Sequence, residues 1–95
     1  MLEKIKSESI DLFFEGILKL ESIDECYSFF EDVCTIKEIR DIAQRLDVAV
    51  KLREKKPYSE VAKETGASTA TISRVNKCLS YGNGGYNTVL ERLGK

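Results

Sequence analysis

The most informative segment of this 95-residue chain is YSEVAKETGASTATISRVNK (residues 58–77), which is rich in short polar and basic side chains. If its second half is helical, one face carries hydroxyl, methyl and cationic groups: Ser68, Thr69, Ala70, Ser73, Arg74 and Lys77. Hydroxyls and cations of this kind bind phosphate oxygens and the base edges exposed in a DNA groove. The segment therefore predicts contact with double-stranded DNA.

The composition argues against an enzyme. The chain has no histidine, the most frequent general acid and base, and no nucleophilic side chain has an evident base partner. Three cysteines, Cys26, Cys34 and Cys78, form no CxxC pair, so the usual zinc-ligand patterns are missing. We expect no catalysis, no metal and no cofactor. We expect the three thiols to be small buried side chains, which is typical of proteins in a reducing, cytoplasmic compartment. No apolar run approaches the length of a membrane span.

Small and apolar residues of the same segment have the spacing of a helix-turn-helix. Val61 and Ala62 lie on one side of a short helix, and Gly66 stands where a tight turn needs a positive φ angle. Ile72 and Val75 recur three residues apart on a second helix, whose polar face is then free to enter a major groove. A plain helical hairpin with the same packing is the alternative.

The rest of the sequence predicts an all-α fold of about six helices. Only Gly16 interrupts the first 56 residues, the single proline is Pro57, and no strand-like alternation is present. Residues 81–86, YGNGGY, are interpreted as a hinge or a helix-ending turn, because the Lys-Ser or Lys-Thr of a phosphate-binding loop does not follow them.

Hydroxyl residues predict where several helices begin. Ser22 and Thr35 are each followed three residues later by a glutamate, which is the pattern of a capping box. Ser59 and Ser68 are the expected caps of the two motif helices.

Charge is divided unevenly along the chain. Residues 1–47 carry twelve acidic and six basic side chains, a net charge of −6, whereas residues 48–95 carry four acidic and nine basic ones, a net charge of +5. The positive half contains the predicted helix-turn-helix, where a phosphate backbone would bind. Lys55 and Lys56 complement the dipole at the end of the preceding helix or contact phosphate, and both readings stay open.

Aromatic residues are concentrated in the N-terminal half. Phe13, Phe14, Tyr27, Phe29 and Phe30 have helical spacing, so packing in a core is the first interpretation. Two adjacent phenylalanine pairs make apolar faces too wide for one neighbouring helix, which favours burial against a second copy of the chain. A two-fold dimer would also supply the second DNA-reading helix.

The nonapeptide GASTATISR (residues 66–74) resembles the Gly-Ala-x-x-Ala-Thr-Ile-Thr-Arg signature of the bacterial Trp repressor. The longer stretch from Phe29 to Tyr86 is similar to the YerC/YecD group of Trp-repressor-like proteins. The resemblance implies a single helical domain over residues 1–95 that forms an intertwined homodimer. It implies dimerisation helices within 8–55 and 85–93, a helix-turn-helix at 58–80, and transcriptional regulation by operator binding.

The resemblance also assigns DNA contacts. The residues that match Thr69, Ala70, Thr71 and Ser73 face the operator, much of it through ordered water, which suits short hydroxyl side chains. The residue that matches Arg74 holds the carboxylate of the co-repressor, whereas a generic helix-turn-helix would place it on DNA. Both roles stay open for Arg74.

A ligand slot of the family would involve Arg45, Arg74, Val75 and Cys78. Arg45 matches the second ligand-holding arginine only if one residue is deleted from the long helix. Val75 replaces the glycine beside the indole, and Cys78 replaces a serine that meets the amino group of the ligand, although a thiol is the poorer hydrogen-bond partner. We expect no response to L-tryptophan. The slot holds another small co-repressor or is filled by protein.

These patterns predict a sequence-specific DNA-binding transcriptional regulator, a repressor, that acts as a cytoplasmic homodimer. The alternative is a protein-interaction module that kept a helix-turn-helix scaffold and binds DNA weakly. A pI near 5.5 and the small number of cations on the second motif helix favour that alternative.

Overall fold

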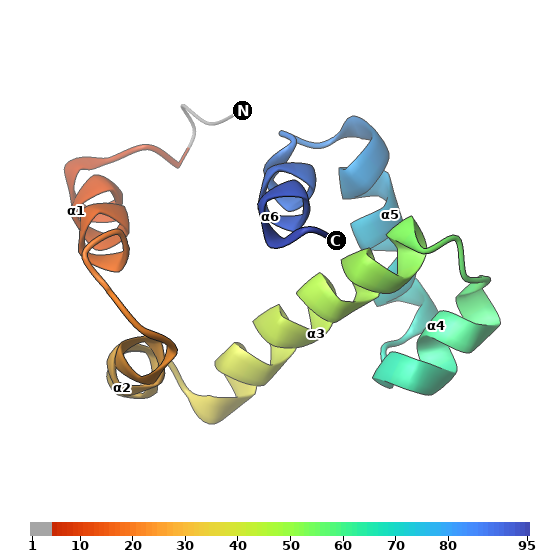
Figure 1. Cartoon of the computed structure of the whole chain (residues 1–95), viewed down its shortest axis with the longest axis horizontal. Coiled ribbons are helices and arrows are strands. Elements are labelled where there is room, and N and C mark those ends of the chain that lie inside the picture. Colours follow the sequence, from red (N-terminus) through yellow and green to blue (C-terminus); the bar gives the residue numbers. More distant parts are fainter. Residues whose placement is uncertain (1–4) are drawn as a thin grey trace. The chain divides into compact units, whose positions relative to one another are not determined.

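The computed structural model describes residues 5–95, and this part of the chain forms six α-helices without a strand (Figure 1). The helices are α1 (Glu8–Ile17), α2 (Ile23–Val33), α3 (Ile36–Arg53), α4 (Tyr58–Thr65), α5 (Thr69–Tyr81) and α6 (Gly85–Leu93). The predicted all-α class is confirmed. Backbone contacts divide the chain into two compact units, the first ending at Ile36 and the second spanning Lys37–Lys95.

Serine side chains begin three of the helices. The hydroxyls of Ser7, Ser22 and Ser68 each accept a hydrogen bond of 3.1 Å from the backbone amide three residues later. Amides in the first turn of a helix have no partner within the helix, so each serine satisfies one of them. The predicted caps Ser22 and Ser68 are thereby confirmed.

The start of α4 differs from the sequence prediction. Pro57 is the residue before this helix, with extended backbone and no side-chain cap, and Ser59 lies inside the first turn. The prediction that Ser59 caps α4 is therefore wrong. Proline is tolerated there because the missing amide would have no partner inside the helix. Thr35, in contrast, directly precedes α3 as predicted.

In the first unit, α1 and α2 meet through four phenylalanine rings. The ring of Phe13 lies 6.0 Å from that of Phe29 and 6.3 Å from that of Phe30, measured between centroids. Phe14 contacts Phe13 at 5.8 Å, and Phe29 contacts Phe30 edge-on at 5.4 Å. These separations lie in the favourable range for aromatic pairs, so the phenylalanines pack together as the sequence predicts.

The phenylalanine cluster does not enclose a core by itself. Neither α1 nor α2 contains a buried residue. Several large apolar side chains on the two helices or just after α1 are exposed, with the exposed fractions Leu12 69%, Leu18 82%, Ile23 75% and Tyr27 65%. Within the single chain, the first unit thus presents more apolar surface than two helices normally leave in water.

The second unit has a closed apolar core. Figure 1 shows α4, α5 and α6 around the C-terminal half of α3. Its buried members are Val48, Ala49, Val61, Ala67, Ile72, Val75 and Leu90. The two alanines allow neighbouring backbones to approach closely, and the β-branched residues fill the space between them.

Polar ties connect the C-terminal helices. The Arg53 Nη1 on α3 donates to Asn87 Oδ1 on α6 at 2.9 Å, and Asn87 Nδ2 donates to the carbonyl of Leu79 on α5 at 3.2 Å. A glycine ends α5, since the Gly82 amide donates to the Cys78 carbonyl at 2.9 Å. The glycine-rich residues 81–86 therefore include a helix-ending turn, one of the two predicted readings.

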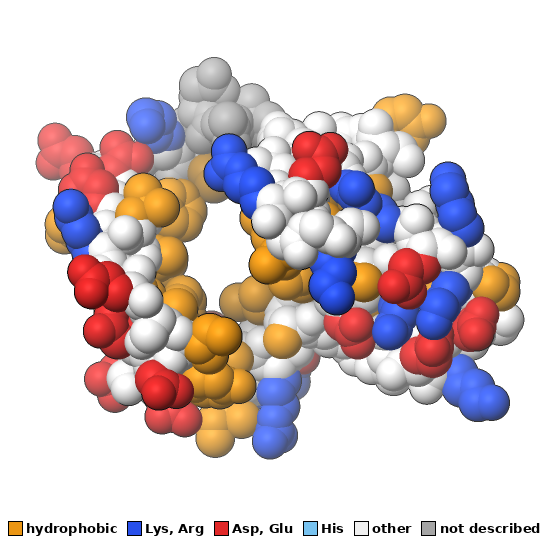
Figure 2. All heavy atoms as spheres, viewed as in Figure 1, with side chains coloured by type: hydrophobic (Ala, Val, Ile, Leu, Met, Phe, Trp, Pro, Cys, Tyr) orange, Lys and Arg blue, Asp and Glu red, His pale blue; other side chains and the backbone are white. Residues whose placement is uncertain are grey.

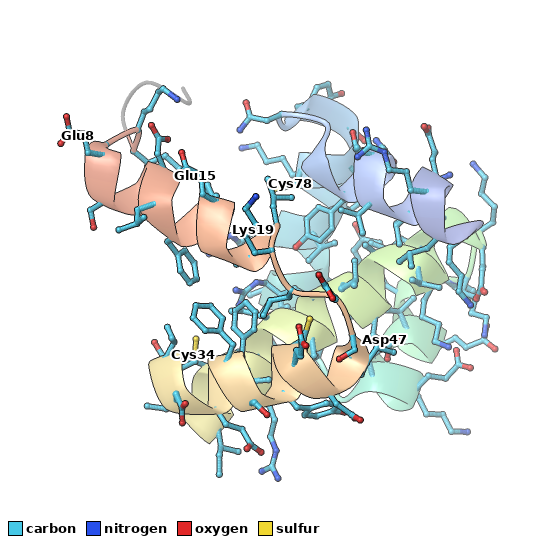
Figure 3. All side chains as sticks on the ribbon, turned by 60° about the vertical axis from the view of Figure 1, so that its left-hand side comes forward. Glu8, Glu15, Lys19, Cys34, Asp47 and Cys78 are labelled. Carbon is cyan, nitrogen blue, oxygen red and sulfur yellow. The ribbon has the colours of Figure 1, made fainter. Side chains whose placement is uncertain are left out.

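The three cysteines are free thiols, and only Cys34 is even half-buried. Figure 3 shows Cys34 where α2 ends and Cys78 on α5. Cys26 and Cys78 are exposed, so the predicted burial of these two thiols is wrong for the single chain. The first unit encloses no core around Cys26, since α2 has no buried residue, and Cys78 lies on the exposed side of α5, four residues after Arg74.

Replacing Gly82 with alanine is expected to destabilise the second unit. The added Cβ would lie 2.5 Å from the Cys78 carbonyl oxygen, and a backbone atom within a helix cannot easily move away. By analogy with overpacked sites, we expect the free energy of unfolding to fall by about 1–3 kcal/mol in urea denaturation. The control is Gly16→Ala in α1, where no atom lies within 4 Å of the new Cβ. That change should leave stability equal or higher, and equal losses in both variants would contradict the steric explanation.

Candidate nucleic-acid interface

Helices α4 and α5 form a helix-turn-helix with a three-residue connection. Gly66 adopts φ +74°, and its amide donates to the Ala62 carbonyl at 2.9 Å. Side chains with a Cβ are strained at this φ, which explains the glycine. Ala62 is half-buried against the apolar core, as the close crossing of two helices requires. The predicted turn is confirmed.

The turn is also fixed by side chains that sequence reasoning missed. The Thr65 hydroxyl donates to the Val61 carbonyl at 2.7 Å and accepts from the Ala67 amide at 3.2 Å. From α3, Gln44 Nε2 donates to the Thr65 carbonyl at 3.1 Å. Threonine followed by glycine gives a weak local signal for such a turn, whereas no sequence pattern points to Gln44, which lies 21 residues away.

One side of α5 is anchored in the core. Ile72 and Val75 are each 1% exposed and belong to the same buried cluster as Val48 and Ala49 of α3. These positions confirm the predicted apolar face of the second motif helix. Because α5 is held on this side, the opposite side faces outward.

The predicted DNA-contacting residues divide into two groups. Ser68, Thr69, Ala70, Ser73, Arg74 and Lys77 are exposed, whereas Thr71 is half-buried. The Ser68 hydroxyl accepts from the Thr71 amide and also donates to Thr71 Oγ1 at 3.1 Å. Ser68 and Thr71 are therefore engaged in starting the helix. At the helical period, Ala70, Ser73, Arg74 and Lys77 share the face opposite Ile72.

Tyr81 extends this outer face beyond the predicted residues. It is the last residue of α5, lies one turn after Lys77, and is 86% exposed. Sequence reasoning assigned Tyr81 to the glycine-rich loop, so it was not counted on the helix face. The i, i+4 relation to Lys77 was the signal that could have identified it.

Charges around the motif are partly neutralised. Lys56 Nζ lies 2.9 Å from Glu64 Oε1, with side chains 27% and 34% exposed. The hydrogen bond from Lys56 lowers the pKa of Glu64 below its ordinary value, and the same bond raises the pKa of Lys56. This pairing ties the loop before α4 to α4 itself, so Lys56 has a structural partner. Lys55 adopts φ +66° in the same loop.

The two units differ in charge. Figure 2 shows acidic side chains gathered over α1 and α2, whereas acidic and basic side chains are mixed over α4 and α5. Residues 37–95 contain twelve basic and seven acidic side chains, a net charge of +5. The second unit therefore carries the positive charge that a phosphate backbone requires.

The residues of the candidate ligand slot lie in different environments. Val75 is buried in the apolar core, whereas Arg74 and Cys78, four residues apart on α5, are both exposed. Arg45 is half-buried on α3. The Val75 side chain thus occupies space within the protein.

Residues 5–95 contain neither a candidate membrane-spanning helix nor a cluster of metal-binding side chains. In this part of the chain no helix is long and apolar enough to cross a membrane. The same residues contain no group of three or more His, Cys, Asp or Glu side chains arranged to hold a metal ion.

The chain matches a known protein family over nearly its full length. The family model described as Trp repressor protein matches residues 8–94. The chain belongs to the Trp repressor family. Membership in this family indicates a DNA-binding protein of the helix-turn-helix class, and it agrees with the exposed polar face of α5.

Individual relatives support the assignment over nearly the full chain. The uncharacterized protein YerC of Bacillus subtilis (strain 168) is 51% identical over 92 residues, which cover 97% of this chain and 88% of YerC. A TrpR-like protein from Eubacterium eligens ATCC 27750 has a TM-score of 0.93 and 55% identity, covering 97% of this chain and 95% of that one. A candidate Trp repressor from Staphylococcus aureus has a TM-score of 0.95 and 44% identity, covering 99% and 94%. The predicted Trp-repressor-like fold and family are confirmed.

Substitutions on α5 should separate the helix start from the outer face. Ser68→Ala removes the cap, and we expect the free energy of unfolding to fall by about 1 kcal/mol. Ser73→Ala on the exposed face should change it by no more than about 0.5 kcal/mol. Chemical denaturation of both variants measures this difference. An equal effect of the two substitutions would contradict the division into capping and outward residues.

Proposed function

We propose that this protein is a sequence-specific DNA-binding regulator, a repressor, that acts as a homodimer in the cytoplasm. One observation carries the proposal: α5 is anchored by buried Ile72 and Val75 while its short polar and basic residues face outward. A helix held in this way can enter the major groove as a rigid body. The family assignment supports the same conclusion.

The outer face of α5 suits close approach to base edges. Ala70 and Ser73 have short side chains, so the helix backbone can come near the floor of the groove. Lys77 and Arg74 lie on the same side and can reach phosphates or guanine. Tyr81 adds a phenolic hydroxyl one turn further along, which can donate to a phosphate oxygen.

Few cations are available on each copy, so one copy alone should bind weakly. Each phosphate contact adds a small, salt-dependent increment to affinity. Two copies related by a two-fold axis would place two α5 helices on successive turns of the groove. Binding should therefore depend on a dimer.

The exposed apolar residues of the first unit support such a dimer. Covering Leu12, Leu18, Ile23 and Tyr27 would remove a large apolar area from water, and each aliphatic side chain buried contributes about 1.5–3 kcal/mol. Identical copies are the most common partners that cover such surfaces. The alternative occupant is a different protein, as expected for an interaction module.

We further propose that the regulator does not respond to L-tryptophan. A ligand placed beside position 75 would have to displace a valine that is 1% exposed and part of the core. The exposed Cys78 thiol is also a weak hydrogen-bond partner for an amino group. L-tryptophan should therefore leave the thermal midpoint unchanged, and a midpoint that rises with its concentration would contradict this proposal.

Lys77→Gln should weaken DNA binding and reduce its dependence on salt. Removing one phosphate contact per copy lowers the slope of log affinity against log salt by about one for each copy bound. Fluorescence anisotropy with genomic fragments at several salt concentrations measures both effects.

The matched control is Lys19→Gln in the first unit, which removes the same charge outside the motif and should leave the slope nearly unchanged. Equal slopes for wild type and Lys77→Gln would contradict a phosphate contact by Lys77. No sequence preference by the wild type at any salt, together with stoichiometric recovery of another protein, would decide for the interaction module.

The assembly itself is a separate prediction. Sedimentation equilibrium should give twice the 10.7 kDa of the chain. The double variant Leu12→Gln with Ile23→Gln should raise the dimer dissociation constant at least tenfold, because each change places a polar amide at an apolar position that the proposed dimer would bury. Glu15→Gln on α1 is the control and should leave it unchanged. A wild-type protein that is monomeric at micromolar concentration would contradict the proposed dimer.

A further inference from the structure

Gln44 links the long helix α3 to the turn of the motif. Its side chain is half-buried, and Nε2 donates to the carbonyl of Thr65, the last residue of α4, at 3.1 Å. Carbonyls in the last turn of a helix have no partner inside that helix. Gln44 therefore supplies, from another helix, a hydrogen bond that the end of α4 needs.

This contact differs in kind from the apolar packing around it. Val48 and Ala49 of α3 belong to the same buried cluster as Ile72 and Val75 of α5, but apolar burial is non-directional. A hydrogen bond restricts both distance and angle. The bond from Gln44 meets the carbonyl that directly precedes Gly66, where the chain changes direction between the two helices.

The rest of the turn is built from local contacts. Thr65 Oγ1 bonds to Val61 and Ala67, and the Gly66 amide bonds to Ala62. These bonds make the turn rigid within itself, but they all lie inside residues 61–67. Gln44 ties this rigid turn to α3. The hydrogen bond from Gln44 therefore joins the turn directly to α3, in addition to the apolar burial of α5.

We propose that Gln44 is a positioning residue for DNA reading: through Thr65 it fixes the orientation of α5, and thereby the discrimination between DNA sequences. The inference rests on the proposed function. The orientation of α5 decides whether its side chains can bond to base edges, whereas contacts to phosphates depend on that orientation much less. Ser73 lies four residues after Thr69, the first residue of α5, roughly 6 Å along the helix at 1.5 Å per residue, so a tilt of α5 at the turn displaces it.

Three variants test the assignment. Gln44→Met keeps the length of the side chain and removes the donor, whereas Gln44→Lys keeps a donor of similar reach. Asn87→Ala is the matched control, since it removes side-chain hydrogen bonds within the same unit but at α6 and the end of α5. Each is compared with wild type for affinity to a selected site and to random DNA at one salt concentration, with unfolding measured alongside.

We expect Gln44→Met to lower the ratio of specific to non-specific affinity about threefold to tenfold, the range that corresponds to loss of one hydrogen bond. Gln44→Lys should restore most of the ratio, and Asn87→Ala should leave it unchanged even if its stability falls as much. A ratio that follows stability in all three variants would overturn the positioning role.

Amide hydrogen exchange tests the same inference without DNA. In Gln44→Met the amides of Gly66 and Ala67 should exchange about threefold to tenfold faster, and in Asn87→Ala they should be unchanged. Unaltered exchange at the turn in Gln44→Met would overturn the inference. Faster exchange in a protein whose wild type shows no sequence preference would instead refute the proposed function and leave the structural tie established.

Discussion

The motif depends on the burial of Ile72 and Val75, which belong to one apolar cluster with Val48 and Ala49. This burial decides which side of α5 is hidden and therefore which residues can face a partner. Removing a β-branched side chain from this cluster would loosen α5 as well as the core, because packing in protein interiors leaves little free space. The polar side of α5 faces outward only while Ile72 and Val75 stay buried.

The burial of Val75 is also the basis for proposing that this Trp-repressor-like fold does not respond to L-tryptophan. Val75 contributes to the core, so the position beside a tryptophan ligand in the family is here part of the protein interior. A residue that stabilises the reading helix would thus also close the space for a co-repressor. In this view the outer face of α5 is formed without a ligand, and regulation would come from dimerisation or from another signal.

Local features were the ones that the sequence could predict. Gly66 needs a positive φ, Ser68 satisfies the first amides of α5, and Ile72 with Val75 follow the helical period, so each is encoded within a few residues. Gln44 could not be found in this way, because its partner is 21 residues away and glutamine has no special preference for such a contact. Ser59 was expected to cap α4 although Pro57 precedes the helix, and Tyr81 was assigned to the loop although it ends α5. Sequence patterns define helix ends to within a few residues only. Burial of the thiols was expected from residue type, which does not show how completely a helix is covered.

In-vitro selection of bound DNA from a random pool tests the central claim most directly, since it asks for sequence preference and assembly together. Two anchored α5 helices in a two-fold dimer predict enrichment of two inverted half-sites with centres about 10 base pairs apart, one turn of the double helix. Enrichment of no sequence would contradict DNA reading by α5. A single half-site without its inverted repeat would contradict the dimer.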